Sequence, residues 1–252
     1  MRWGQTEPTL RLQRRLSLGF IPVTYLAVST WMRLGKRYRI YELDRVRREF
    51  EEIASQGEGP FIICANHLTL IDSMLIIWAL RPMWRYVRAP RTFPWNLPDK
   101  RNFFHSHLRR MLCYMGKCVP VLRGGPREEA QRTFRKISYL LSQGESIMIF
   151  PEGGRSRTGR VDTENYAYAV GRILQDSPGA RVLCVYLRGR GQEHYGDLPR
   201  RGEGFDVSLK AIAPSTRDRG LRGGRDLATQ IIEELKNMEL AHFEKRGDLS
   251  QG

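Results

Sequence analysis

Three short apolar runs most constrain how this chain of 252 residues can fold. They are FIICA (61–65), SIMIF (146–150) and RVLCVYL (181–187). Runs of this length and composition are typical of strands that are buried on both faces. Segments with apolar residues at helical spacing separate them, and strands that alternate with helices predict an α/β fold. We therefore predict a largely parallel central sheet flanked by helices.

The remaining pattern fills in the elements around these strands. Apolar stripes or capping residues predict helices in six places: a helix striped by Leu43, Val46, Phe50 and Ile53, residues 71–80, residues 103–112, a helix opened by Pro126 and stopped by Gly144, residues 164–174, and a last long helix striped by Leu227, Ile231, Leu235 and Met238. Further strands are predicted at 84–89, 118–122 and 205–209, the last of them more exposed.

Polar residues follow two of the strands at the point where each ends. NHLTLIDS comes after residues 61–65, and PEGGRSRTG follows Phe150. In open α/β sheets, sites form where the carboxyl ends of strands meet the starts of helices. The sequence therefore predicts that both segments contribute to one site, although a polar loop explains each segment alone.

His67 and Asp72 are the strongest chemical pair in the first segment. We expect Thr69 to cap the next helix, with Asp72 in its first turns, so that the carboxylate can reach the imidazole. A carboxylate on one ring nitrogen fixes the tautomer and leaves the other nitrogen free as a base. Such a pair without its own nucleophile suits deprotonation of a substrate hydroxyl. A histidine that is simply satisfied by a nearby helix carboxylate is the alternative.

The second segment combines glycines with arginines. Gly153 allows close backbone approach, and Arg155, Arg157 and Arg160 are donors suited to phosphate oxygens. Glu152 is expected to pair with an arginine or to bind a substrate hydroxyl. A glycine-rich surface turn with solvated arginines is the alternative.

The net charge of +15 and pI near 10.1 indicate an anionic partner, unless they reflect only a basic, solvated surface. Nucleic acid, an anionic membrane and a phosphorylated substrate all qualify. Nucleic acid is disfavoured, because the sequence has no zinc-ligand framework, RNA-recognition signature or helix-turn-helix pattern. The four cysteines include no Cys-x-x-Cys and are predicted to be reduced, as on the cytoplasmic face of a membrane. No histidine has metal-ligand spacing, so no metal is expected.

The N-terminal segment LSLGFIPVTYLAVSTW (16–31) lies between basic flanks. As a helix it reaches about 24 Å, short of the roughly 30 Å hydrocarbon core of a bilayer. We predict that it lies in the membrane interface; a core helix is the alternative. The expected organisation is a membrane-association element at 1–56 and an α/β domain at 57–252.

The ordered motifs resemble the glycerol-phosphate and lysophosphatidic acid acyltransferase family. Asn66, His67 and Asp72 match its Asn-His-x4-Asp block, with Thr69 where serine is common. GKCVPVLRG, with Gly116 and Arg123, is similar to the second block. Phe150–Ser156 matches Phe-Pro-Glu-Gly-Thr-Arg-Ser, with Gly154 in place of threonine.

The resemblance implies acyl transfer at a membrane. The donor would be acyl-CoA or acyl carrier protein, the acceptor a lysophospholipid, and no cofactor would be required. His67 and Asp72 would be catalytic, and Gly116, Arg123, Glu152, Gly153, Arg155 and Ser156 would bind substrate. In this scheme Arg123 and Arg155 hold the acceptor phosphate, Glu152 organises their pocket, and backbone amides near the helix start stabilise the oxyanion.

Two departures from the family concern the acceptor. The fourth block is VLCVYLRG, without its usual proline, and ENYAYAVG stands where a Phe-Lys-x-Gly stretch is common. Lysophosphatidic acid is the first candidate acceptor; glycerol 3-phosphate, a lyso-aminolipid or a specialised lipid is the second. A non-catalytic basic module that binds membranes or nucleic acid is an alternative of another class.

Overall fold

The computed structural model describes residues 7–103 and 106–247, and has a mixed α/β architecture. Its six strands are β1 (Arg39–Ile40), β2 (Phe61–Ala65), β3 (Trp95–Asn96), β4 (Ile147–Ile149), β5 (Arg181–Gly189) and β6 (Gly204–Ile212). They form one sheet in the order β1-β6-β5-β2-β4-β3. Four of the pairings are parallel and β5–β6 is antiparallel. The predicted largely parallel sheet is confirmed.

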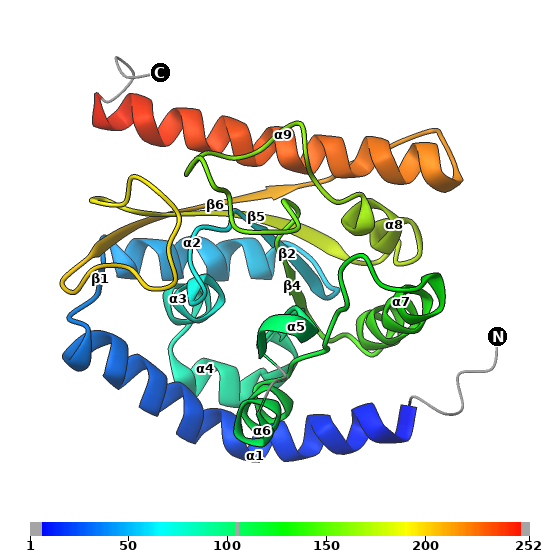
Figure 1. Cartoon of the computed structure of the whole chain (residues 1–252), viewed down its shortest axis with the longest axis horizontal. Coiled ribbons are helices and arrows are strands. Elements are labelled where there is room, and N and C mark those ends of the chain that lie inside the picture. Colours follow the sequence, from blue (N-terminus) through cyan, green and yellow to red (C-terminus); the bar gives the residue numbers. More distant parts are fainter. Residues whose placement is uncertain (1–6, 104–105, 248–252) are drawn as a thin grey trace.

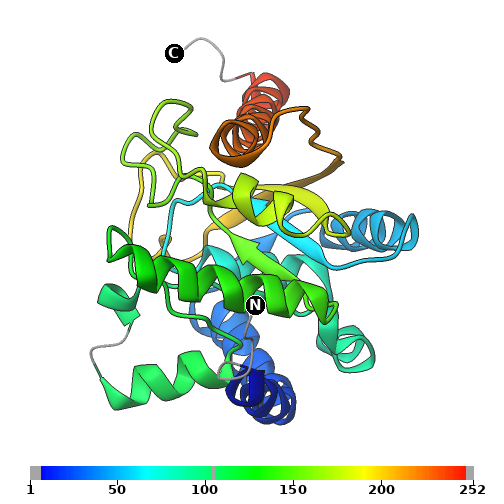
Figure 2. The same cartoon turned by 90° about the vertical axis from the view of Figure 1, so that its right-hand side faces the viewer.

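Helices cover both faces of this sheet (Figure 1). Their bounds are α1 (Glu7–Thr30), α2 (Leu43–Ser55), α3 (Asp72–Leu80), α4 (Met83–Arg88), α5 (Lys100–Phe103), α6 (His107–Met115), α7 (Arg127–Ser142), α8 (Ala169–Gln175) and α9 (Gly220–Arg246). One face carries α8 and α9, and the other carries α2 and α3, with α1, α4 and α6 beyond them (Figures 1 and 2).

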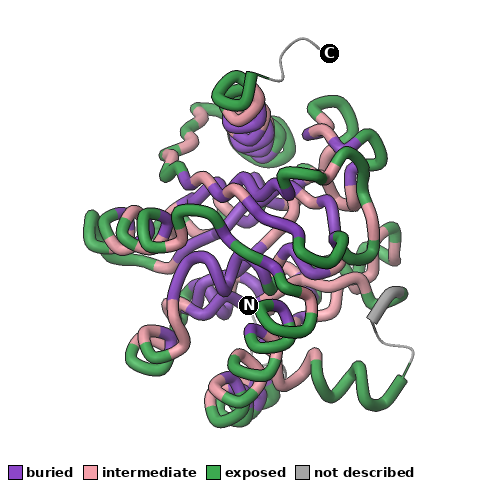
Figure 3. Tube along the Cα trace, turned by 90° about the vertical axis from the view of Figure 1, so that its left-hand side faces the viewer, coloured by how far each residue is buried: buried purple, intermediate pink, exposed green. Residues whose placement is uncertain are grey.

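The sheet separates two apolar cores because alternate residues of each strand point to opposite faces. Ile63 and Val185 join the core that contains α2 and α3, whereas Ile62 and Cys184 join the core beneath α9. Figure 3 shows this buried centre within exposed outer helices. Ile21 and Met32, from the N-terminal segment, also belong to the first core, so residues on both sides of position 56 share it.

Several predicted elements differ from the structure. Residues 84–89, predicted as a strand, belong largely to α4. This helix has only 6 residues, of which Tyr86 alone is buried, and so short a pattern also fits the alternation of a strand. Residues 118–122 contribute only isolated bridges. The helix predicted at 164–174 begins only at Ala169. Within the helix predicted at 103–112, residues 104–105 lie outside the described part of the chain, and α6 covers its second half.

Strand β6 is more exposed than β2 and β5, as predicted: its apolar residues Phe205, Val207 and Leu209 are buried, and less buried residues lie between and beyond them. Helices α2, α3, α7 and α9 agree with the predictions. None of the described helices is long and apolar enough to cross a bilayer.

Candidate active site

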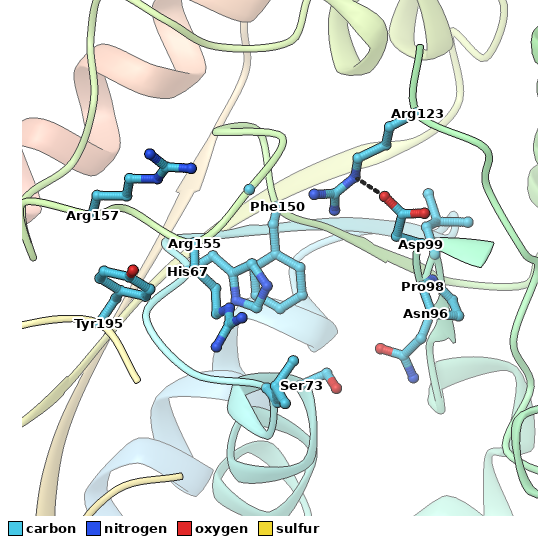
Figure 4. A pocket seen from close by; sticks show the side chains of 13 residues that line it. His67, Ser73, Asn96, Pro98, Asp99, Arg123, Phe150, Arg155, Arg157 and Tyr195 are labelled. Carbon is cyan, nitrogen blue, oxygen red and sulfur yellow. Dashed lines mark ion pairs between the residues drawn. The ribbon is translucent and has the colours of Figure 1, made fainter. Parts of the chain in front are cut away.

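The two polar segments meet at the carboxyl ends of neighbouring strands. β2 and β4 are parallel, with Cys64 beside Ile149, so the residues after each strand emerge at the same edge. A pocket of about 420 Å³ lies there (Figure 4). It is lined by His67, Leu70, Ser73, Asn96, Leu97, Pro98, Asp99, Arg123, Phe150, Gly154, Arg155, Arg157 and Tyr195.

His67 and Asp72 are in direct contact. The imidazole Nδ1 lies 3.0 Å from Asp72 Oδ2, and the histidine side chain is 14% exposed against 4% for the aspartate. Asp72 is the first residue of α3, where the helix dipole favours a negative charge. This contact leaves the second ring nitrogen of His67 for the pocket, which the ring lines.

Asp72 also organises the loop between β2 and α3. Its carboxylate accepts hydrogen bonds from the amides of Leu68 (2.6 Å) and Thr69 (2.8 Å) and from the Thr69 hydroxyl. Thr69 was expected to cap the helix, but the N-cap position belongs to Ile71 and the Thr69 side chain contacts Asp72 instead. The loop therefore fixes the carboxylate that contacts His67.

The backbone amides nearest the helix start already have acceptors within the protein. His67 N donates to Glu152, Leu68 N and Thr69 N donate to Asp72, and Leu70 N donates to Asp197 O. The expectation that such amides face an oxyanion does not hold for these four. The described pocket instead presents side-chain donors, chiefly guanidinium groups.

The segment Phe150–Ser156 contacts both the ring and the main chain of His67, in addition to the contact with Asp72. The Phe150 ring stacks on the imidazole, with centroids 4.1 Å apart. Ser156 N donates to His67 O at 2.9 Å, and Glu152 Oε1 accepts from His67 N at 2.9 Å. Gly153, at φ 69°, makes the turn that returns the chain, with its amide on Phe150 O. The main chain and the ring of His67 are thus both fixed by this segment.

Glu152 does not make the arginine pair that was one of its two predicted contacts. Its carboxyl group contacts the amides of His67 and Asp162, not an arginine. Burial raises the pKa of Glu152 to about 8, although both amide donors act in the opposite direction. The neighbouring acids Glu239 and Asp162 raise it further. At neutral pH the group therefore carries a proton for much of the time.

Three arginines border the pocket around His67 (Figure 4). Arg155 donates to Asp197 Oδ1 at 2.6 Å and to Gly196 O at 2.8 Å. Arg123 lies 3.8 Å from Asp99, and its pKa is lowered by burial. Arg157 is exposed. Guanidinium groups in this arrangement can bind phosphate oxygens beside the imidazole.

Other predicted residues lie behind the pocket or away from it. Gly116, Gly153 and Ser156 are not among the residues that line the pocket. Gly116 is the C-cap of α6, and Gly153 shapes the turn after β4. Ser156 is buried, and its hydroxyl donates to Arg160 O. The guanidinium group of Arg160 stacks on Phe243, 3.9 Å from the ring centroid, and is likewise not part of the lining.

Sequence reasoning missed one wall of the pocket. Tyr195 lines it and Asp197 positions Arg155, yet both come from the connection between β5 and β6. Asn96, the last residue of β3, and Asp99, which follows the strand, lie across the pocket from Tyr195 (Figure 4), and Leu97 also lines it. Nothing in the local sequence marks these residues, because only the sheet order brings them to His67.

Comparison with known proteins agrees with this geometry. A family model described as Acyltransferase matches residues 37–185. The chain is similar to tafazzin of Drosophila melanogaster, with 25% identity over 186 residues, 72% of this chain and 42% of the relative. It is also similar to a chloroplastic 1-acyl-sn-glycerol-3-phosphate acyltransferase of Arabidopsis thaliana, with 23% identity over 154 residues, 61% of this chain and 38% of the relative. In both cases the aligned part spans less than half of the relative. Since the family model matches more than half of the chain and includes both segments of the site, this protein belongs to the acyltransferase family.

Proposed function

We propose that this chain transfers a fatty acyl group from a thioester to the hydroxyl of a lysophospholipid, with 1-acyl-glycerol-3-phosphate as the acceptor and phosphatidic acid as the product. One observation carries the proposal. An imidazole held by a buried carboxylate lines a pocket that also presents three guanidinium groups. This combination suits a base that acts next to a phosphate.

In the proposed reaction, the free ring nitrogen of His67 removes the proton of the acceptor hydroxyl. The oxygen attacks the thioester carbonyl and forms a tetrahedral intermediate. Its collapse expels the thiolate, which takes the proton back from the imidazolium. Asp72 keeps His67 in the required tautomer and stabilises the positive charge that forms on the ring.

Arg123 and Arg155 are assigned to the acceptor phosphate, and Arg157 joins them because it lines the same pocket. The Asp197 carboxylate, which is 75% exposed, holds Arg155 in place. Guanidinium groups also remain charged at any physiological pH, so they suit a phosphate that is anionic throughout this range. Glu152 takes the role of organising the pocket, through the backbone of His67.

The donor is proposed to be acyl-CoA or acyl carrier protein. The enzyme is proposed to act at the cytoplasmic face of the inner membrane. The four free cysteines support a reducing compartment. The similarity to an enzyme named as a 1-acyl-sn-glycerol-3-phosphate acyltransferase supports the acceptor class.

A panel of acceptors tests the proposal. Purified protein is given an acyl-CoA or acyl carrier protein donor with lysophosphatidic acid, glycerol 3-phosphate or a lyso-aminolipid, and thiol release and the lipid product are measured. Turnover of lysophosphatidic acid that is lost in His67→Ala supports the proposal. Turnover of another acceptor alone would correct the acceptor, and salt-sensitive nucleic-acid binding without turnover would favour a non-catalytic basic module.

A further inference from the structure

Helix α1 carries an apolar stripe that faces away from the protein. Leu12, Leu16, Phe20, Val23 and Leu26 are all exposed, Val23 at 61%. Their spacing of three or four residues places them on one side of the helix. The stripe continues beyond α1 with Trp31 and Leu34, which is 73% exposed.

The opposite side of α1 is already occupied by the domain. Leu10, Gln13, Ser17 and Ile21 of α1 are buried. Arg14 bonds at 2.5 Å to Glu145, a buried residue that also pairs with the fully buried Lys117. The helix therefore packs on the domain through one side, and its apolar stripe is a second surface that packing does not explain.

Helix α6 extends this surface. Leu108, Met111 and Leu112 are exposed along one side of a helix in which no residue is buried. The backbone of Tyr114 joins it to α1 by accepting hydrogen bonds from Gln13 and Ser17. Both helices lie at the end of the molecule opposite α9 (Figures 1 and 2).

We call this surface the α1–α6 face. It consists of Leu12, Leu16, Phe20, Val23, Leu26, Trp31 and Leu34 with Leu108, Met111 and Leu112. Contiguous apolar patches on a soluble surface mark sites that bind a partner or a membrane.

The charge around the α1–α6 face identifies the partner. Residues 8–41 contain seven Lys or Arg and no Asp or Glu, and α6 adds Arg109 and Arg110 without an acid. Arg15, Arg33 and Arg37 are exposed beside the apolar stripe, as are both arginines of α6. An apolar stripe bordered only by cations matches the acyl region and the anionic headgroups of a bilayer.

We infer that the α1–α6 face lies in the interface of an anionic membrane, with α1 parallel to the bilayer plane. This inference rests on the proposed function and deepens it by naming the surface through which the enzyme meets its lipid. It also extends the interfacial segment expected at 16–31 to α6, more than seventy residues further along the chain.

The orientation brings the membrane close to the site. Helices α5 and α6 project from the same side of the molecule (Figures 1 and 2). Asp99, immediately before α5, lines the pocket that contains His67. A lysolipid in the leaflet that faces the protein then lies on the side of the molecule from which α5 projects, next to the pocket that contains the arginines.

The α1–α6 face is best tested with point variants. A deletion of residues 1–33 would also remove the buried contacts that α1 makes with the domain. Two double variants, Leu16→Ser with Val23→Ser and Leu108→Ser with Met111→Ser, are compared with Leu221→Ser on α9. Leu221 is 89% exposed at the opposite end of the molecule, so it is a matched control. Thermal unfolding confirms that each variant is folded.

Binding is measured by flotation with phosphatidylcholine vesicles that contain or lack phosphatidylglycerol. Each double variant is expected to weaken binding about tenfold or more, whereas Leu221→Ser leaves it unchanged. Arg109→Gln with Arg110→Gln is expected to lower binding only to the anionic vesicles, and added salt should have the same effect.

Unchanged vesicle binding in both double variants would overturn the inference, as would an equal loss in Leu221→Ser. If the double variants instead turn a dimer into a monomer while vesicle binding persists, the face joins two copies of the chain and the inference is wrong.

The outcome is separable from that of the proposed function. His67→Ala should bind vesicles like the wild type, and the double variants should still acylate a short-chain acceptor dissolved as monomers. Vesicle binding without any acyl transfer would refute the proposed function alone.

Discussion

The ring of Phe150 lies against the imidazole of His67, with the two planes 21° apart and the centroids 4.1 Å apart. Phe150 follows β4 and His67 follows β2, so residues 83 positions apart in the sequence form one stacked unit. Together with the Asp72 contact, this stack leaves the imidazole little freedom to turn. The pairing of β2 with β4 therefore fixes the orientation of the ring to which the proposed reaction assigns the role of base.

Phe150→Leu should lower kcat about three- to tenfold with little change in the KM for the acceptor. Such a loss corresponds to the roughly 0.5–1.5 kcal/mol attributed to an aromatic pair, if the stack holds the imidazole in its reactive orientation. Steady-state kinetics measures it, with Phe150→Tyr as the control that retains a stacking ring. Equal impairment of both variants would show that the stack itself is not what matters.

Glu152→Gln should make stability less dependent on pH. Since burial raises the pKa of Glu152 from an ordinary value of about 4.3 to about 8, the unfolded chain binds fewer protons than the native state between these values. The free energy of unfolding of the wild type should therefore fall as pH rises through this window. The Glu152→Gln variant should lack this fall, because glutamine does not titrate. Urea midpoints at both ends of the window measure it, and parallel curves for the two proteins would contradict the protonated carboxyl.

Arg155→Ala should raise the KM for a phosphorylated acceptor by about 10- to 100-fold, the equivalent of roughly 1.5–3 kcal/mol for hydrogen bonds to a charged group. The thioester donor should be affected much less. Asp197→Ala should give a smaller increase, because it frees Arg155 without removing it. Arg132→Ala on the exposed side of α7 is the control, and an unchanged acceptor KM in Arg155→Ala would remove the phosphate role.

Lys117→Ala should destabilise the fold by about 3–5 kcal/mol, because it removes the amino group 2.6 Å from the carboxylate of the buried Glu145. Lys100→Ala is the matched control: Lys100 pairs with Glu129 at 2.9 Å on the surface, where an ion pair contributes at most about 1 kcal/mol. Denaturant unfolding compares the two. Equal losses of unfolding free energy in the two variants would mean that the buried Lys117–Glu145 pair contributes no more to stability than the surface Lys100–Glu129 pair.

The sequence predicts the frame of the molecule well, since buried strands leave a strong local signal. β2, β4 and β5 coincide with apolar runs because both faces of each strand are covered. α4 was predicted as a strand because six residues with one buried side chain fit either period. Short elements at the edge of a core carry too little pattern to distinguish the two.

The site is predictable only where its contacts are local. His67 and Asp72 are five residues apart, so their approach can be expected from a turn before a helix. The position of Glu152 behind His67 depends on the pairing of β2 with β4, and its amide contacts were not foreseen. Tyr195 and Asp197 reach the pocket from another connection, which no motif marks.

The most direct measurement is the rate of acyl transfer by His67→Ala and Asp72→Asn with lysophosphatidic acid and a thioester donor. Loss of the base should lower kcat about 10³-fold or more, at the scale of general base catalysis, while circular dichroism shows a native fold. Asp72→Asn should also be severely impaired, since an amide holds the imidazole in the wrong tautomer. Near-normal turnover by a folded His67→Ala enzyme would contradict the account at its centre.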